Sequence, residues 1–412
     1  MKRYAALALG LAGVIGASVT SGEHARAAAC GTSGTAISTT TTGTLGNNRS
    51  SAPSIDGNGE LVAFESDATN FGTSNGVRNI WVKNVCTGAL VLATQSSAGV
   101  AANGASYAAS IDEAGDTVVY DSFATNLAAG ATKHEQVYAH NLGTGVTTLV
   151  SDTALGVQGN RNSNAPIISP DGGYVAFESE ATNFGGSTSG DFNIYVKDLA
   201  SGALTVVTNE STGNSKFPWI SSGGSYVSFY SNADFGWGAG VDQVYQANLA
   251  TAQVSLVSEA AGVPGNAGST LPSMDADGRY IVFDSLATNI TDAAKTQVIL
   301  HDQVTGTNTV LSRSSSGVAG TAGSGVAWID DNGAAVAFVS AATNLVSGAA
   351  PHSLYLATVG GSTLEAFTTP APASGPTVDA AGDTLAVTVT PGATSGNRTQ
   401  AGPTSQIYLE FP

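Results

Sequence analysis

The stretch that decides the fold reads Ala165-Pro-Ile-Ile-Ser-Pro-Asp-Gly-Gly-Tyr-Val-Ala-Phe-Glu-Ser-Glu-Ala-Thr-Asn183. Its apolar residues fall into two short runs, 165–168 and 174–178, which are separated by Ser169-Pro170-Asp171-Gly172. Pro, Asp and Gly in this order favour a tight turn, because Pro fixes φ and Gly tolerates left-handed backbone. The stretch therefore predicts a β-hairpin that leaves its second strand through a polar segment.

The same pattern returns along nearly the whole chain. Each copy holds four strand-like pieces, which in the third copy are 165–168, 174–178, 193–197 and 204–208. An aromatic residue, or Val387 in the last copy, follows the turn glycine at a fixed offset, whereas the distance between copies drifts. This is typical of an array of supersecondary units. The turn glycines of the seven copies are Gly59, Gly115, Gly172, Gly224, Gly278, Gly333 and Gly382.

Four-stranded antiparallel units repeated in this way predict an all-β fold, a seven-bladed β-propeller. The run Pro166-x-Ile-Ser-Pro-Asp-Gly-Gly-Tyr-Val-Ala-Phe-Glu-Ser179 resembles the repeat of TolB-type, WD-repeat-like propellers. The resemblance covers roughly residues 51–412 and implies the fold rather than one activity, because this repeat occurs in many unrelated exported proteins. TolB itself carries an α/β domain before its propeller, for which this sequence has no room, so we do not expect TolB.

The two ends of the repeat array predict how the ring closes. The seventh copy supplies only three strands, 376–378, 384–389 and 406–410, and the segment 34–42 resembles the missing outer strand. Pairing the two ends would remove an exposed sheet edge. Cys30 would then lie beside Cys86, in a turn of the first blade, and we expect a disulfide between them.

The N-terminus predicts export. Residues 1–29 have the pattern of a signal peptide, with Lys2 and Arg3 before an apolar run and small residues at its end. A lipid anchor at Cys30 is disfavoured, because Ala27 stands where a lipoprotein signal usually has Leu. We therefore expect a periplasmic or extracellular protein without a membrane span. Residues 30–412 would form one domain, with blades at about 52–95, 106–151, 163–208, 216–258, 269–312, 323–368 and 375–412, the last completed by 34–42.

The composition limits the classes of partner. The 412 residues carry a net charge of −17, which argues against binding nucleic acid or anionic lipid through a basic face. We expect a monomer that needs no cofactor or metal. Calcium at the Asp-Gly turns, such as 275–278, stays an open alternative, although the remaining ligands of a calcium loop are missing.

Polar residues that recur in every copy are interpreted as structural. Ser-x-Ala-Thr-Asn follows the second strand in five copies, and an amide such as Gln136 opens the third strand in six. We expect these amides to form buried latches to the Ala-Thr-Asn loops. His140 and His301 share a repeat position with Lys and Glu, which indicates a solvated strand end.

Function is expected where the copies differ, in the loops between second and third strands. The candidate binding residues there are Arg78, His134, Asp191, Phe192, Phe235, Trp237, Asp242 and His352. They suggest an exported, non-enzymatic binding or scaffold protein that contacts a protein or a cell-envelope polymer. The alternative is a lyase or hydrolase acting on extracellular polysaccharide or peptide at the central opening. That alternative requires titratable groups to converge near the axis, and no catalytic residue is assigned.

Overall fold

The computed structural model describes residues 30, 33–72, 76–129, 133–186, 189–209, 212–238, 240–361, 363–367, 369, 373–390 and 405–412. The expected signal peptide, residues 1–29, lies outside the described residues. Within them, no helix is both long and apolar enough to cross a membrane.

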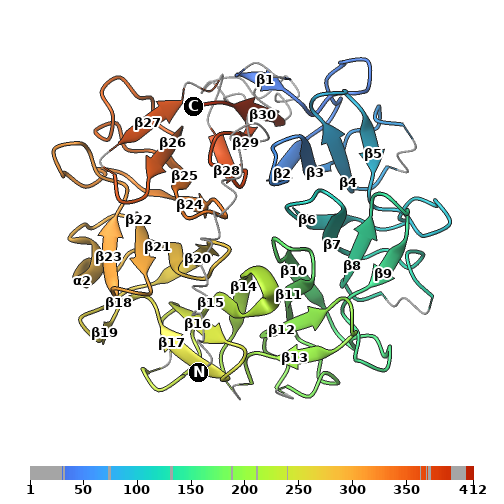
Figure 1. Ribbon diagram of the computed structural model, residues 1–412, viewed down its shortest axis with the longest axis horizontal. Coiled ribbons are helices and arrows are strands. Elements are labelled where there is room, and N and C mark those ends of the chain that lie inside the picture. Colours follow the sequence, from blue (N-terminus) through green and yellow to red (C-terminus); the bar gives the residue numbers. More distant parts are fainter. Residues whose placement is uncertain are drawn as a thin grey trace, which may run out of the picture.

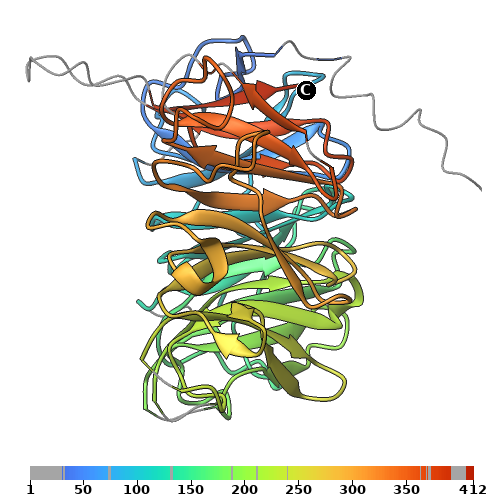
Figure 2. The same ribbon diagram turned by 90° about the vertical axis from the view of Figure 1, so that its left-hand side faces the viewer.

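Seven four-stranded antiparallel sheets surround a central axis, as expected (Figure 1). Seen from the side, the blades stack into a thick disc (Figure 2). In each blade the first strand lies innermost and the fourth lies at the rim. We call the end of the disc with the second-to-third-strand loops the loop face, and the opposite end, with the hairpin turns, the turn face.

The strands of blades one to four, listed from the axis outward, are as follows. Blade one has β2 (Ser50–Ile55), β3 (Leu61–Ser66), β4 (Asn79–Asn84) and β5 (Leu90–Leu92). Blade two has β6 (Ser106–Ile111), β7 (Thr117–Ser122), β8 (Gln136–Asn141) and β9 (Thr147–Leu149). Blade three has β10 (Ser163–Ile168), β11 (Tyr174–Ser179), β12 (Asn193–Asp198) and β13 (Leu204–Val206). Blade four has β14 (Ser215–Ile220), β15 (Tyr226–Ser231), β16 (Gln243–Asn248) and β17 (Gln253–Leu256).

The other three blades follow the same order. Blade five has β20 (Ser269–Met274), β21 (Tyr280–Ser285), β22 (Gln297–Asp302) and β23 (Thr307–Val310). Blade six has β24 (Ser324–Ile329), β25 (Ala335–Ser340), β26 (Ser353–Thr358) and β27 (Leu364–Phe367). Blade seven has β28 (Ala373–Val378), β29 (Leu385–Val389), β30 (Gln406–Glu410) and β1 (Thr35–Ala36). Outside the blades lie the hairpin β18 (Glu259–Ala260) and β19 (Val263–Pro264), the 3-10 turn η1 (Ser222–Gly224) and the helix α2 (Thr288–Thr291).

The N-terminal strand closes the ring as the sequence predicts. Thr35 pairs with Leu409 and Ala36 with Tyr408, so β1 is the outer strand of blade seven. Cys30 and Cys86 form the expected disulfide, with 4.6 Å between their Cα atoms. The disulfide therefore ties the closing strand of blade seven to blade one.

The hydrophobic core is divided among the blade interfaces. Seven apolar clusters are present, and each joins the facing sheets of two neighbouring blades. The turn glycines are needed for this approach: Gly172 has φ 71°, and a Cβ there would lie 2.7 Å from Oδ2 of Asp112 in the preceding blade. A Cβ would be similarly crowded at the turn glycines of blades two and four to seven, so these turns approach their neighbours closely only without a side chain.

The recurrent Ser-x-Ala-Thr-Asn segments are structural, as expected. The Ser66 hydroxyl lies 3.0 Å from the Ser50 hydroxyl, and Asn70 Oδ1 accepts the N–H of Asn47 at 3.0 Å. The amides that open the third strands are buried and hydrogen bonded, as expected. The prediction that they bind the Ala-Thr-Asn loops was wrong. Gln136 Nε2 donates to the carbonyl of Arg161 at 2.8 Å, and Ser151 donates to Gln136 Oε1. Gln136 therefore binds the connection to the next blade, whereas Asn79 Nδ2 donates within its own second-to-third-strand loop, to the carbonyl of Val77 at 2.9 Å.

The position of His140 and His301 is not solvated, contrary to expectation. His140 and His301 are buried, as are Lys83, Lys197 and Glu410 at the same position. Lys197 Nζ lies 2.5 Å from Asp152 Oδ1 in the connection between blades two and three. His140 Nδ1 instead lies 2.8 Å from the Thr147 hydroxyl of the fourth strand, so the position accepts polar residues that find different buried partners.

Candidate functional site

The innermost strands all bulge at the same place. The ladder between the first and second strands shifts register after the second residue, as between Ser51 and Ser54. The third residue then takes a left-handed conformation, with φ near 50°, although it is a bulky residue in three blades. These residues are Ala52, Ala108, Ala165, Phe217, Leu271, Val326 and Gly375. Left-handed φ is strained for Phe, Leu and Val, and such strain is concentrated at functional sites.

Polar side chains of the preceding blade hold these bulges. The N–H of Ala108 donates to Glu65 Oε1 at 3.0 Å, and that of Phe217 donates to Glu178 Oε2 at 2.8 Å. Asp121, Asp284 and Thr388 play the same part for Ala165, Val326 and Ala52. A carboxylate is thereby buried next to the axis in four of the seven blades.

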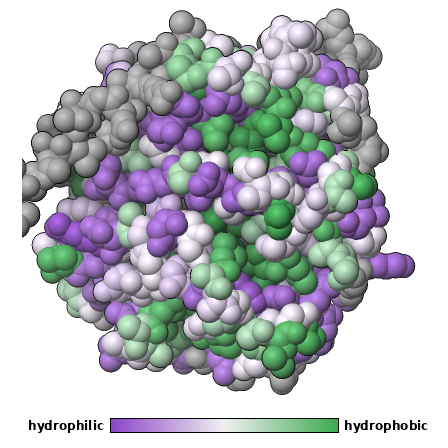
Figure 3. Space-filling view, turned by 45° about the vertical axis from the view of Figure 1, so that its right-hand side comes forward, coloured by the Kyte–Doolittle hydropathy of each residue, from purple (hydrophilic) through white to green (hydrophobic). Residues whose placement is uncertain are grey.

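The bulges surround an apolar cavity of about 330 Å³, which we call the channel mouth. Its wall is uneven. Blades four to six contribute Phe217, Leu271 and Val326 at their bulges, whereas the bulge residues of blades seven, one, two and three are Gly or Ala. Phe217 and Val326 are each 46% exposed. Figure 3 shows apolar residues gathered near the middle of the visible face, between hydrophilic ones.

Two tryptophans separate the channel mouth from the opposite end. Trp219 of β14 and Trp328 of β24 contact edge to face, with 4.4 Å between ring centroids. Both line the channel mouth and also a smaller cavity of about 40 Å³ at the turn face, where Glu113 and Asp331 lie. The pair therefore lies between the two cavities and borders the channel mouth on its turn-face side.

At the edge of the channel mouth, blade one carries an ion-pair network. Arg78 Nη1 lies 3.2 Å from Glu65 Oε2, and Arg78 Nη2 lies 2.8 Å from Asp67 Oδ2. The guanidinium also lies over the ring of Tyr107, 5.0 Å from its centroid. Desolvation by burial raises the pKa of Glu65 above its usual value despite these contacts. Arg78 is thus a structural partner of carboxylates in its own blade.

At the same edge, blade two carries two carboxyls that lie near each other. Asp121 and Glu135 lie near enough to influence each other's pKa, and burial is the largest cause that raises the pKa of both. Asp121 is 3% exposed and Glu135 is 9% exposed. Asn164 Nδ2 donates to Glu135 Oε2 at 3.4 Å.

At the channel-mouth edge of blades three and four, acidic side chains lie beside aromatic rings. Burial raises the pKa of Glu178 to about 7, while the nearby Lys216 lowers it. Lys216 Nζ lies 4.6 Å from the centroid of the Phe192 ring, and Phe217 stacks on Tyr230 with 5.8 Å between centroids. Burial and the charge of Glu178 raise the pKa of Tyr230 to about 12.

The predicted site residues do not converge. Arg78, Phe192, Asp242 and His352 occupy the same position on blades one, three, four and six, directly before the third strand. At this position the carbonyl accepts the first N–H of the next blade, as Arg78 does from Ser106 at 3.0 Å. His134 and Asp191 lie one residue earlier on blades two and three. The fold therefore distributes these residues around the ring.

Two predicted aromatic contacts differ in their environment. Phe235 packs inside blade four, 4.8 Å from Tyr245 between centroids, at the position that Phe71 and Phe184 fill in other blades. Trp237 is 40% exposed. Phe235 is thus part of the packing of its blade, and Trp237 remains available at the surface.

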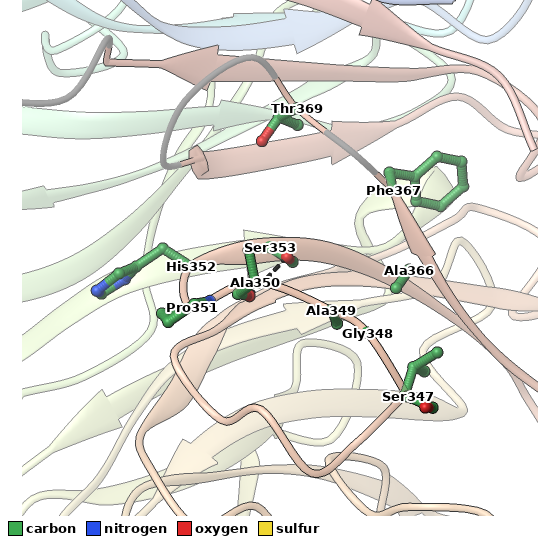
Figure 4. A pocket seen from close by; sticks show the side chains of 11 residues that line it. Ser347, Gly348, Ala349, Ala350, Pro351, His352, Ser353, Ala366, Phe367 and Thr369 are labelled. Atoms are coloured by element: carbon green, nitrogen blue, oxygen red, sulfur yellow. Dashed lines mark hydrogen bonds between the residues drawn. The ribbon is translucent and has the colours of Figure 1, made fainter.

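His352 lines a second cavity of about 340 Å³ beside β26, with Phe367 on the opposite side (Figure 4). The imidazole points away from Phe367, and Ser353 donates to the carbonyl of Ala350 at 2.7 Å. Neither cavity contains a cluster suited to a metal: among the described residues, no three His, Cys, Asp or Glu side chains group in that way.

The sequence matches no protein-family model and no curated protein. Solved structures share its fold. The β-propeller domain of the trilobed protease from Pyrococcus furiosus aligns with a TM-score of 0.57 at 12% identity, covering 88% of this chain and 95% of that one. The oligogalacturonate lyase of Vibrio parahaemolyticus aligns with a TM-score of 0.56 at 12% identity, covering 88% and 89%. TolB from Acinetobacter baumannii aligns with a TM-score of 0.43 at 17% identity, covering 77% and 62%.

The fold is a seven-bladed β-propeller with distant structural similarity to the lyase and to the propeller domain of the protease. At such identities the similarity concerns the fold alone, and the neighbours include enzymes and other proteins. Any functional assignment must therefore come from the site itself.

Proposed function

We propose that this protein is an exported, non-enzymatic binding module that contacts a protein or a cell-envelope polymer through its loop face. The observation that carries the proposal is the channel mouth, an apolar hollow bordered on its turn-face side by Trp219 and Trp328. Concave apolar sites with a few polar groups at their edge are typical ligand sites. Export is supported by the Cys30–Cys86 disulfide, because disulfides persist in oxidising compartments.

The enzymatic alternative receives less support. The polar residues that it requires lie on different blades, and Arg78 is held by carboxylates of its own blade. Asp121 and Glu135 lie in one blade, but Asp121 Oδ2 accepts the N–H of Ala165 at 3.0 Å. This carboxyl therefore already holds the bulge of the next blade, which is a structural role.

Titration with N-phenyl-1-naphthylamine, a neutral fluorophore whose emission rises in apolar surroundings, tests the proposal. Phe217→Asn and Val326→Asn remove apolar surface from the channel mouth, and Asn tolerates the left-handed backbone at both positions. We expect saturable binding to the wild type and about tenfold weaker binding to either variant.

The matched control is Val304→Asn. Val304 is 74% exposed in a turn of blade five, on the opposite face, so its replacement removes comparable apolar surface elsewhere. Binding that responds equally to Val304→Asn and Val326→Asn would contradict a site in the channel mouth.

A further inference from the structure

Two positions lie close together at the channel-mouth edge of blades one and two. One is the second-strand residue that holds the next bulge, and the other is the residue directly before the third strand. In blade one these are Glu65 and Arg78, which form an ion pair at 3.2 Å. In blade two they are Asp121, next to last in β7, and Glu135, directly before β8. The chain therefore places a second carboxyl where blade one has a guanidinium.

The carboxyls of blade two are incompletely satisfied. Asp121 is 3% exposed, and its Oδ2 accepts the N–H of Ala165 at 3.0 Å. Its Oδ1 has no hydrogen-bond donor in the described part of the chain. A buried polar atom without a partner costs free energy. A cation supplied from outside would offset that cost, as Arg78 does within blade one.

An aromatic wall flanks the same place. Tyr107 pairs in register with Asp121, and its ring contacts that of Phe123 edge to face, with 6.5 Å between centroids. Phe123 is exposed. Aromatic rings attract cations, and the Tyr107 ring already lies against the guanidinium of Arg78. Both the charge and the rings therefore favour a positively charged group.

We propose that Asp121 and Glu135 bind the cationic side chain of a Lys or Arg residue in a partner polypeptide, whose neighbouring apolar side chain occupies the channel mouth. This inference rests on the function proposed above. Tyr107 and Asn164, which border the acid pair, directly precede Ala108 and Ala165 in the wall of the channel mouth. A chain that carries basic and apolar side chains next to each other fits this continuity, and a neutral polysaccharide does not.

The test is selection from a random peptide library with acetylated and amidated ends, against the wild type and Glu135→Arg. The variant supplies the missing guanidinium from within and reproduces the Glu65–Arg78 pair of blade one. Glu365→Arg makes the same change of charge on an exposed position of the outer strand β27. We expect peptides selected by the wild type and by Glu365→Arg to be enriched in Lys or Arg beside an apolar residue.

Peptides selected by the wild type should bind it about tenfold more tightly than they bind Glu135→Arg. Glu135→Gln should give the same loss of Lys and Arg enrichment, while both variants retain N-phenyl-1-naphthylamine binding. Equal Lys and Arg content in the peptides selected by the wild type and Glu135→Arg would overturn this inference. If the fluorophore still binds in the channel mouth, that result leaves the proposed function standing. If the fluorophore does not bind, the proposed function fails as well.

Discussion

The ring of Trp219 meets the ring of Trp328 at 4.4 Å between centroids, although the two residues belong to blades four and six. This contact, made past blade five, lies between the channel mouth and the turn-face cavity. Both rings belong to the part of the ring, blades four to six, whose bulge residues are large, whereas the bulge residues of the other blades are Ala or Gly. The binding proposal depends on this asymmetry.

Removing one of the two rings should be costly. Trp328→Ala leaves a void between the channel mouth and the turn-face cavity, and we expect a loss of about 3 kcal/mol in the free energy of unfolding. Denaturation in urea measures it. Trp237→Ala, at a residue that is 40% exposed, is the control and should cost less than about 1 kcal/mol. Equal losses would show that the Trp219–Trp328 contact contributes little.

The turn glycines should differ in their tolerance according to their neighbours. Gly172 and Gly202 have similar φ values of 71° and 70°. A Cβ at Gly172 would lie 2.7 Å from Asp112, whereas one at Gly202 would meet nothing within 4 Å. Gly202→Ala should therefore cost only the backbone strain, about 1 kcal/mol. Gly172→Ala should cost at least about 1 kcal/mol more, and urea unfolding that ranks the two variants equally would contradict the proposed close approach between blades.

Stability should fall as the pH rises toward neutrality. The hairpin turns of five blades begin with a buried Asp that accepts an N–H of the next strand, as Asp56 does from Leu61 at 3.0 Å. Burial raises the pKa of Asp56 and Asp379 to about 7, and that of Asp275 and Asp330 to about 6. Because the folded state keeps these protons after the unfolded state has lost them, stability decreases between about pH 4 and pH 7 and then levels off.

Melting temperatures measured from pH 4.5 to pH 8 test this dependence. Asp56→Ser should flatten it, because blades three and four already use Ser169 and Ser221 at the same position, where each hydroxyl accepts the equivalent N–H. Asp277→Ser, which removes an exposed carboxyl from a turn on the same face, serves as control. A melting temperature that rises from pH 5 to pH 7 would contradict the prediction.

The disulfide should act on ring closure. Cys30 and Cys86 are 56 residues apart in the sequence, and the chain-entropy argument gives about 4 kcal/mol for a crosslink of that span. Cys30→Ser together with Cys86→Ser should lower the free energy of unfolding by up to that amount. Hydrogen exchange should accelerate at Ile37, whose N–H donates to the carbonyl of Ile407 at 2.8 Å. Unchanged exchange at Ile37 would show that the strand pairing alone holds the ring.

The sequence predicts the blades well, because each repeats one hydrophobic pattern with one turn. The closing strand and the disulfide follow from counting strands in the last copy. Exposure of polar positions is harder to predict: His140 and Lys197 look interchangeable and therefore solvated, yet both are buried against connections between blades. The left-handed residues carry almost no signal, since Ala52, Phe217 and Val326 share no property that requires positive φ.

The acid pair could have been found by comparing copies. In each repeat, the next-to-last residue of the second strand can be compared with the residue directly before the third strand. In blade one these are Glu65 and Arg78, and in blade two they are Asp121 and Glu135. The change from opposite to like charge is visible in the sequence. Its meaning depends on the two positions lying in contact near the axis, which strand register and blade packing establish only in three dimensions.

Energy transfer from the channel tryptophans tests the central claim most directly. Trp81→Tyr and Trp237→Ser leave Trp219 and Trp328 as the only tryptophans, and Tyr is the residue that blades two and three have in place of Trp81. On titration with N-phenyl-1-naphthylamine, we predict saturable quenching of tryptophan emission in step with the rise in probe fluorescence. Adding Val326→Asn should shift both signals to about tenfold higher probe concentration. Probe binding without tryptophan quenching, or quenching that is unchanged by Val326→Asn, would contradict a ligand site in the channel mouth.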